Sequence, residues 1–108
     1  PYGSVKNSSG GFIKADLASV TGAAAGAQIP DDFRVSITNP PGASAYPIAS
    51  FAWLLIPEKM QDSAKRKALV DFLSWMLRDG QKFAQPLSYA PLPQEVIAKE
   101  TKAIQRIQ

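Results

Sequence analysis

The sequence predicts an α/β fold, and it predicts that this chain is one part of a larger structure. Residues 62–79 and 93–108 have the apolar periodicity of amphipathic helices. Residues 48–56 are instead expected to form a strand, apolar without alternation from Phe51 onward, as in strands covered by helices on both faces. Such a strand needs neighbours, and few other segments have comparable strand character. We therefore expect a larger sheet whose other strands are encoded outside these 108 residues.

The composition excludes several classes of site. The chain is 45% hydrophobic and 19% charged, and its net charge of +3 is spread along the sequence rather than gathered in the basic stripe of a nucleic-acid-binding protein. Cysteine and histidine are absent, which excludes disulfides, thiolate nucleophiles, imidazole metal ligands and a Ser-His-Asp arrangement. No apolar run approaches the roughly 20 residues that span a bilayer, so we expect no direct membrane insertion.

The first third of the chain predicts a hairpin followed by a helix and a strand. The turn formers Asn7-Ser8-Ser9-Gly10-Gly11 separate two short extended pieces within residues 1–14. Asp16 is a candidate N-cap for a small-residue helix that runs from Leu17 to about Ala27. Residues 33–37 alternate apolar and polar side chains, which is typical of a half-buried strand.

The stretch from Thr38 to Pro47 has the most restricted backbone in the sequence. It contains Asn39-Pro40-Pro41-Gly42, which fits neither a helix nor a central strand, and it ends at Tyr46-Pro47. We interpret it as a connection between two bodies of structure. Thr38 and Asn39 are weak candidates for contact with a ligand held between those bodies, although turn capping is the interpretation we favour.

Two helices are expected to close the chain. Asp62 is the predicted N-cap of the first, and Gly80 is expected to end it in a left-handed conformation. This helix carries the cationic run Lys65-Arg66-Lys67, which we interpret as a solvated face in preference to a docking site for an acidic partner. The second helix is expected to start at Pro93 and continue to the end of the chain, with an ion pair between Glu95 and Lys99.

No group of residues predicts catalysis. Asp31-Asp32 is the only adjacent carboxylate pair, and we interpret it as part of a turn. The segment Ser8-Ser9-Gly10-Gly11 comes nearest to a phosphate-binding loop, but it leads into an extended piece rather than a helix, so a turn is favoured over an anion contact. Trp53 and Trp75 lie in strongly apolar elements and are expected in the core. We predict a protein that is not an enzyme and that has no metal or cofactor.

A resemblance to a known family runs along most of the chain. The segment Ile37-Thr38-Asn39-Pro40-Pro41-Gly42-Ala43-Ser44-Ala45-Tyr46-Pro47-Ile48, followed by the apolar residues 50–57, resembles the periplasmic phosphate-binding proteins of Pst-type ABC importers. Similar features continue at Ala23-Ala24-Ala25-Gly26-Ala27, Val70-Asp71-Phe72-Leu73-Ser74-Trp75, Gly80-Gln81 and Leu87-Ser88-Tyr89-Ala90-Pro91-Leu92-Pro93.

The resemblance implies the C-terminal part of a type II periplasmic binding-protein fold, in which two α/β lobes are joined by crossing strands. Residues 1–35 would end the second lobe, residues 36–47 would cross between the lobes, and residues 48–108 would return to the first lobe. Thr38, Asn39, Tyr46 and Pro47 would then lie at the hinge. The family's phosphate ligands lie mostly in earlier parts of the full protein, and no ligand is carried over to a position of this sequence.

The function implied by the resemblance is capture of inorganic phosphate for a membrane permease of an ABC importer, in the bacterial periplasm or at the cell surface. Two alternatives stay open at this point. The chain could serve a binding protein for another oxyanion, such as sulfate or molybdate, or it could be a stand-alone structural or interaction module. If the chain is isolated, we expect residues 51–56 to be covered by homodimer formation or segment exchange with another copy.

Overall fold

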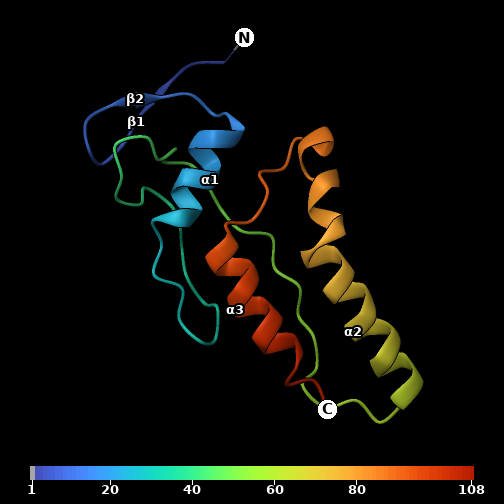
Figure 1. Cartoon of the computed structure of the whole chain (residues 1–108). Coiled ribbons are helices and arrows are strands. Elements are labelled where there is room, and N and C mark those ends of the chain that lie inside the picture. Colours follow the sequence, from blue (N-terminus) through green and yellow to red (C-terminus); the bar gives the residue numbers. More distant parts are fainter. Residues whose placement is uncertain (1) are drawn as a thin grey trace.

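The computed structural model describes residues 2–108, so the first residue of the predicted segment 1–35 lies outside the described part. The elements follow in the order β1 (Val5–Lys6), β2 (Phe12–Ile13), α1 (Leu17–Ala25), α2 (Ser63–Leu77), two 3₁₀ helices (Asp79–Phe83 and Gln85–Leu87) and α3 (Gln94–Ile104). The hairpin and α1 form one end of an elongated molecule, and α2 and α3 form the other (Figure 1). The α/β class is thus present on a small scale, with three α-helices and one two-stranded sheet in residues 2–108.

The predicted hairpin and the helix that follows it are confirmed. β1 and β2 pair antiparallel, with Val5 opposite Ile13. Asp16 caps α1: its carboxylate accepts a hydrogen bond from the Ser19 amide at 2.8 Å, and the Ser19 hydroxyl accepts one from the Asp16 amide at 3.2 Å. This reciprocal pair satisfies two of the amides that a helix start leaves without partners.

A core of small side chains surrounds α1. The buried members, Ala23, Ala24, Ile37, Ala45 and Ala49, are joined by the partly buried Val20, Ala27 and Phe51. Because these side chains are mostly methyl groups, the backbone after residue 37 can approach the helix closely. A Cβ added to Gly26 would come within 3.2 Å of the Pro41 carbonyl oxygen. The glycines that weaken this helix therefore permit the close approach of the loop.

The strand predicted at residues 33–37 does not form. Burial alternates as expected, from half-buried Phe33 through exposed Arg34 to buried Ile37, but no segment of residues 2–108 pairs with this stretch. Phe33 itself has a φ of 59°, outside the extended region. The side-chain pattern was interpreted correctly, whereas the hydrogen-bonded partner that makes a strand is missing.

The strand predicted at residues 48–56 is also absent, for the same reason. The segment has no ladder partner in residues 2–108, and most of it is exposed. Leu55 is 96% exposed and Leu54 is 61% exposed. Phe51 reaches the core around α1, so the start of the segment is held while the rest runs uncovered.

The two predicted C-terminal helices are confirmed, and they contact each other. Leu73 and Leu77 of α2 and Val96 of α3 are buried. The expected left-handed end at Gly80 was wrong, because α2 runs through Arg78 into a 3₁₀ helix that contains Gly80. A Cβ at Gly80 would meet the Trp75 carbonyl oxygen at 3.4 Å, so this glycine permits close packing instead.

The expectation that both tryptophans lie in the core was wrong as well. Trp53 is 49% exposed and Trp75 is 42% exposed. α3 also stops at Ile104 rather than at the end of the chain. The last residue instead returns to the segment before α2, where the Gln108 amide donates to the Glu58 carbonyl at 2.8 Å and the Met60 amide donates to the Gln108 carbonyl at 2.6 Å.

Candidate functional site

The candidate site is the loop from Thr38 to Pro47, which the structure closes with one backbone hydrogen bond. The Asn39 amide donates to the Pro47 carbonyl at 2.7 Å. Asn39 has a φ of 48° and Gly42 a φ of 131°, so the chain turns through the left-handed region twice. Pro40, Ala45 and Pro47 are buried. The closing bond therefore brings the four predicted hinge residues into one loop that is anchored by apolar side chains.

The side chain of Asn7, in the hairpin turn, holds this loop in place. Its amide nitrogen Nδ2 lies 3.1 Å from the carbonyl oxygens of Gly42 and Ala43, and 3.2 Å from that of Ala45. Asn7 is buried, and its two N–H groups are therefore shared among three carbonyls of one loop. An amide in this position satisfies loop carbonyls that would otherwise have no partner.

Two further contacts fix the loop to the hairpin and to α1. The Ser8 hydroxyl donates to the Pro40 carbonyl at 3.0 Å. The Tyr46 amide donates to the carbonyl of Ser19, in α1, at 3.1 Å. The segment that the sequence predicts to cross between lobes is thus bound, along residues 39–47, to structure formed by residues 7–24.

Thr38 and Asn39 are the parts of this loop that face solvent. Both residues are exposed, and neither side chain forms a hydrogen bond to another of residues 2–108. They offer a hydroxyl and a carboxamide, which are neutral donors and acceptors, and no charge. Asn39 shapes the turn through its left-handed backbone, which agrees with the turn role favoured from the sequence. This arrangement could contribute hydrogen bonds to a ligand, but by itself it does not form an enclosed site.

The glycine-rich hairpin turn is not a free anion site. The amides of Ser9 and Gly11 donate to the Asn7 side-chain oxygen at 3.1 and 3.0 Å, and the Gly10 amide donates to the Asn7 carbonyl at 3.0 Å. Three amides that a phosphate would need are thus already engaged with one residue. The turn interpretation made from the sequence agrees with these contacts.

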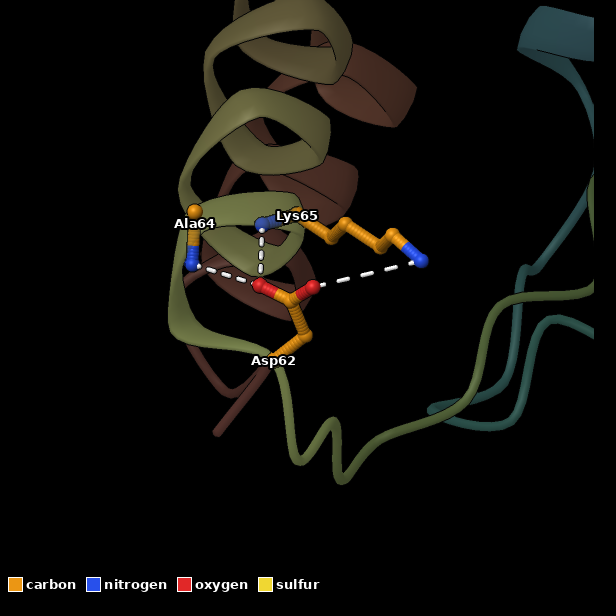
Figure 2. A network of polar contacts seen from close by, with 3 residues as sticks. All are labelled: Asp62, Ala64 and Lys65. Carbon is orange, nitrogen blue, oxygen red and sulfur yellow. Dashed lines mark hydrogen bonds and ion pairs between the residues drawn. The ribbon is translucent and has the colours of Figure 1, made fainter.

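The cationic run on α2 lies on an exposed helix face. Lys67 pairs with Asp71 at 2.6 Å, one helical turn away, and this carboxylate raises the pKa of Lys67 above its ordinary value. Lys65 lies 3.9 Å from the Asp62 carboxylate (Figure 2). Both lysine side chains are more than three-quarters exposed, as expected for a solvated face.

Lys99 forms a contact that the sequence analysis missed. Its ammonium lies 3.0 Å from the Asp31 carboxylate, donates to the Ile29 carbonyl and sits 6.0 Å from the centre of the Phe33 ring. The hydrogen bond from Lys99, and then its charge, lower the pKa of Asp31. The predicted pair of Lys99 with Glu95 does not occur among the ion pairs of residues 2–108. The local i,i+4 spacing favoured Glu95, whereas the actual partner lies 68 residues away.

Two open depressions lie elsewhere on the surface. One, of about 220 Å³, is lined by Ser74, Arg78, Thr101 and Ile104, between α2 and α3. The other, of about 470 Å³, is lined by Lys59, Met60, Gln61 and Gln108. In the described part of the chain, no three acidic side chains come together as metal ligands would. None of the helices in residues 2–108 combines the length and the hydropathy of a membrane span.

No model of a known protein family matches the chain. Individual relatives do match. The chain is 36% identical over 98 residues to the phosphate-binding protein PstS of Xylella fastidiosa strain Temecula1, a match that covers 89% of this chain and 27% of that protein. It is 32% identical over 100 residues to the PstS protein of Pasteurella multocida, covering 91% of this chain and 29% of the relative. For the PstS protein of Methanocaldococcus jannaschii the identity is 33% over 124 residues, covering 99% of this chain and 31% of the relative.

The chain therefore spans only about three-tenths of the length of these curated relatives. Within that part, the resemblance predicted from the sequence is confirmed, since the matches cover about nine-tenths or more of this chain.

Proposed function

We propose that this chain is the C-terminal part of a PstS-type substrate-binding protein, which captures inorganic phosphate and delivers it to the permease of an ABC importer. The observation that carries the proposal is the match of about nine-tenths of the chain to proteins named for phosphate binding. The proposed place of action is the periplasm or the bacterial cell surface. The proposed role is capture and release without chemical conversion of the anion, because such proteins act by closing two lobes around a ligand.

Within that protein, we assign this chain a structural role. Residues 1–35 would belong to the second lobe, residues 36–47 to the crossing segment and residues 48–108 to the first lobe. Thr38, Asn39, Tyr46 and Pro47 would form part of the hinge. The saturated hydrogen bonding of the hairpin turn and the uncharged side chains of Thr38 and Asn39 support a division in which most anion ligands come from the remainder of the protein.

A chimera tests this proposal. The 98 residues of the Xylella fastidiosa protein that match this chain are replaced by the chain itself, and binding of inorganic phosphate is measured by isothermal titration calorimetry. We expect the chimera to bind phosphate and to be little affected by sulfate or molybdate. A folded chimera that prefers one of those other oxyanions would favour the second candidate function, and a folded chimera that binds none would contradict the proposal.

The isolated chain provides the complementary measurement. A ligand at 100 times its Kd stabilises a protein by about 2.7 kcal/mol. We expect millimolar phosphate to leave the melting temperature of the 108-residue chain unchanged, because it lacks most of the anion ligands. A phosphate-specific rise would show that the chain carries a complete site of its own, contrary to the division proposed here.

A further inference from the structure

Apolar side chains are exposed in two places that the proposed site does not use. The first is the apolar segment, residues 51–56, where exposure rises toward Leu55. The second is the aromatic cluster of Phe72, Trp75 and Phe83, whose neighbouring ring centres lie 5.9 and 6.0 Å apart. All three aromatic residues are exposed, between 42% and 54%. Large apolar groups exposed in such numbers are typical of a surface that another protein part covers.

We propose that the apolar segment and the aromatic cluster form the docking surface for the remaining part of the phosphate-binding protein, and that the apolar segment is covered on both faces in the complex. This inference rests on the proposed function. It adds which residues join the two parts and which geometry they adopt. The association would occur even when the two parts are separate polypeptides.

The exposed area supports a large and permanent interface. The chain exposes 7682 Å². A compact monomer of its mass is expected to expose about 5,800 Å², so roughly 1,900 Å² is in excess. The radius of gyration, 15.8 Å, also exceeds the roughly 13 Å of a compact domain of this length. A standard interface buries about 800 Å² on each partner, so the excess is of the size found in obligate assemblies.

The apolar segment argues for cover on both faces. Side chains alternate between the two faces of extended backbone, so Leu54 and Leu55 point in opposite directions. Both are more than half exposed, and neither has a strand neighbour in residues 2–108. Joining another sheet would bury both side chains and supply partners for the backbone amides and carbonyls of the segment.

The occupant follows from the comparison with the relatives. This chain matches only 27% of the Xylella fastidiosa protein, so most of that protein's length lies outside the matched region and is available to cover an apolar surface. A second copy of this chain would itself bring an uncovered segment of the same kind. Pairing two such edges would leave at least part of each apolar face in water. The remainder of the protein is therefore the partner that accounts for the whole exposed area.

Association of two separate polypeptides tests the inference. The 108-residue chain is mixed with the Xylella fastidiosa protein lacking its matched 98 residues, and the Kd is measured by analytical ultracentrifugation. We expect a one-to-one complex. Leu54→Asp and Leu55→Asp should each weaken it at least tenfold, because each places a charge on a different covered face, and Trp75→Ala should weaken it as well. Lys65→Glu, on the solvated face of α2, is the matched control and should change the Kd less than twofold.

These variants should leave the isolated chain intact. Leu54 and Leu55 are already exposed, so the circular dichroism and the melting temperature of the chain should stay close to those of the unmodified chain. Sensitivity to only one of the two leucine variants would contradict cover on both faces. A chain that dimerises with itself and ignores the partner would overturn the inference, as would a complex that both charged variants leave unchanged.

Failure of the inference differs from failure of the proposed function. A complex that forms, shows both leucine effects and binds no phosphate would uphold the docking surface and contradict the function. A chimera that binds phosphate and tolerates both charged variants would uphold the function and contradict the docking surface.

Discussion

At the scale of single residues, two polar side chains connect parts of the chain that are far apart in sequence. Asn7 bonds three carbonyls at residues 42–45, and Lys99 bonds Asp31 and the Ile29 carbonyl. In a molecule whose core consists mainly of alanines, such bonds fix the arrangement of loops that apolar packing leaves loosely defined.

Replacement of Asn7 by alanine should be among the more damaging single changes in the chain. It removes the partner of three loop carbonyls in one step, and each buried group left without a partner costs about 1–3 kcal/mol. We therefore expect the melting temperature to fall by roughly 10 °C or more. Asn7→Asp keeps the side-chain acceptor used by the turn amides but loses the donors, and it should fall similarly. Ser9→Ala, next to it in the same turn, should change the melting temperature by less than about 2 °C.

The Lys99–Asp31 pair should be visible as a displaced acid titration. The pKa of Asp31 lies below its ordinary value of 3.8 because Lys99 donates a hydrogen bond to the carboxylate. A lowered pKa in the folded state stabilises the fold above the ordinary value, and that contribution is lost as the pH falls through the lowered value. In Lys99→Met, the pKa of Asp31 should return toward 3.8, measured by NMR titration of the side-chain carboxyl carbon.

Because the Asp31 carboxylate is almost fully exposed, its effect on global stability should be small and should weaken with added salt. The control is Lys102→Met, a change of the same kind on the same helix, which should leave the Asp31 titration where it is. An unchanged Asp31 pKa in Lys99→Met would show that the contact does not persist in solution.

At the scale of elements, the three α-helices depend on local sequence far more than the expected strands do. Figure 2 shows the start of α2, where one oxygen of the Asp62 carboxylate accepts from the amides of Ala64 and Lys65, both at 3.0 Å. The acceptor and the donors lie within four residues of one another. The helix can therefore start correctly whatever the rest of the molecule does.

Asp62→Ala should fray the first turn of α2 and destabilise the chain by about 1 kcal/mol, the usual cost of losing an N-cap. Asp62→Asn should recover most of the loss, since its side-chain oxygen can accept the same two hydrogen bonds. Asp71→Ala, which breaks only an exposed ion pair on the same helix, is the matched control and should cost less than Asp62→Ala. Amide hydrogen exchange at Ala64 and Lys65 measures the fraying directly. Equal exchange in Asp62→Ala and the unmodified chain would contradict the capping role.

This difference in range explains how much the sequence could predict. The hairpin, α1 with its cap at Asp16, and α2 with its cap at Asp62 were predictable, because each depends on neighbouring residues. The strands at residues 33–37 and 48–56 were not correctly predicted, because a strand needs a partner and none lies in the described residues. In the candidate site, the restricted turn from Thr38 to Pro47 was predictable from its prolines and glycine.

The residues that hold the site were beyond the reach of sequence patterns. Asn7 was recognised only as a turn former, because nothing in the sequence indicates that its side chain meets carbonyls 35 to 38 residues away. Lys99 was assigned to Glu95 by helix spacing, although a loop 68 residues earlier supplies its partner. The weak signal was the pair Asp31-Asp32 in a turn, which offered a carboxylate without naming its partner.

At the scale of the whole molecule, the shape agrees with a part that functions inside a larger protein. The longest dimension, 50 Å, is nearly three times the shortest, 18 Å. The hairpin and α1 lie at one end and α2 at the other, and the uncovered residues 51–56 run between them (Figure 1). Such an open form gives a large perimeter for contact with the rest of a two-lobed protein and little interior of its own.

The exposure of Leu55 also bears on how such a polypeptide must be handled during synthesis. Six consecutive residues without charge or proline, rich in aromatic and aliphatic groups, form the kind of stretch that stacks into fibrils when chains meet before folding. Directly after it come Pro57, Glu58 and Lys59, a chain breaker and two charges of opposite sign, which oppose strand stacking at that end. The order of residues thus allows a sticky core segment to leave the ribosome with its safeguard immediately behind it.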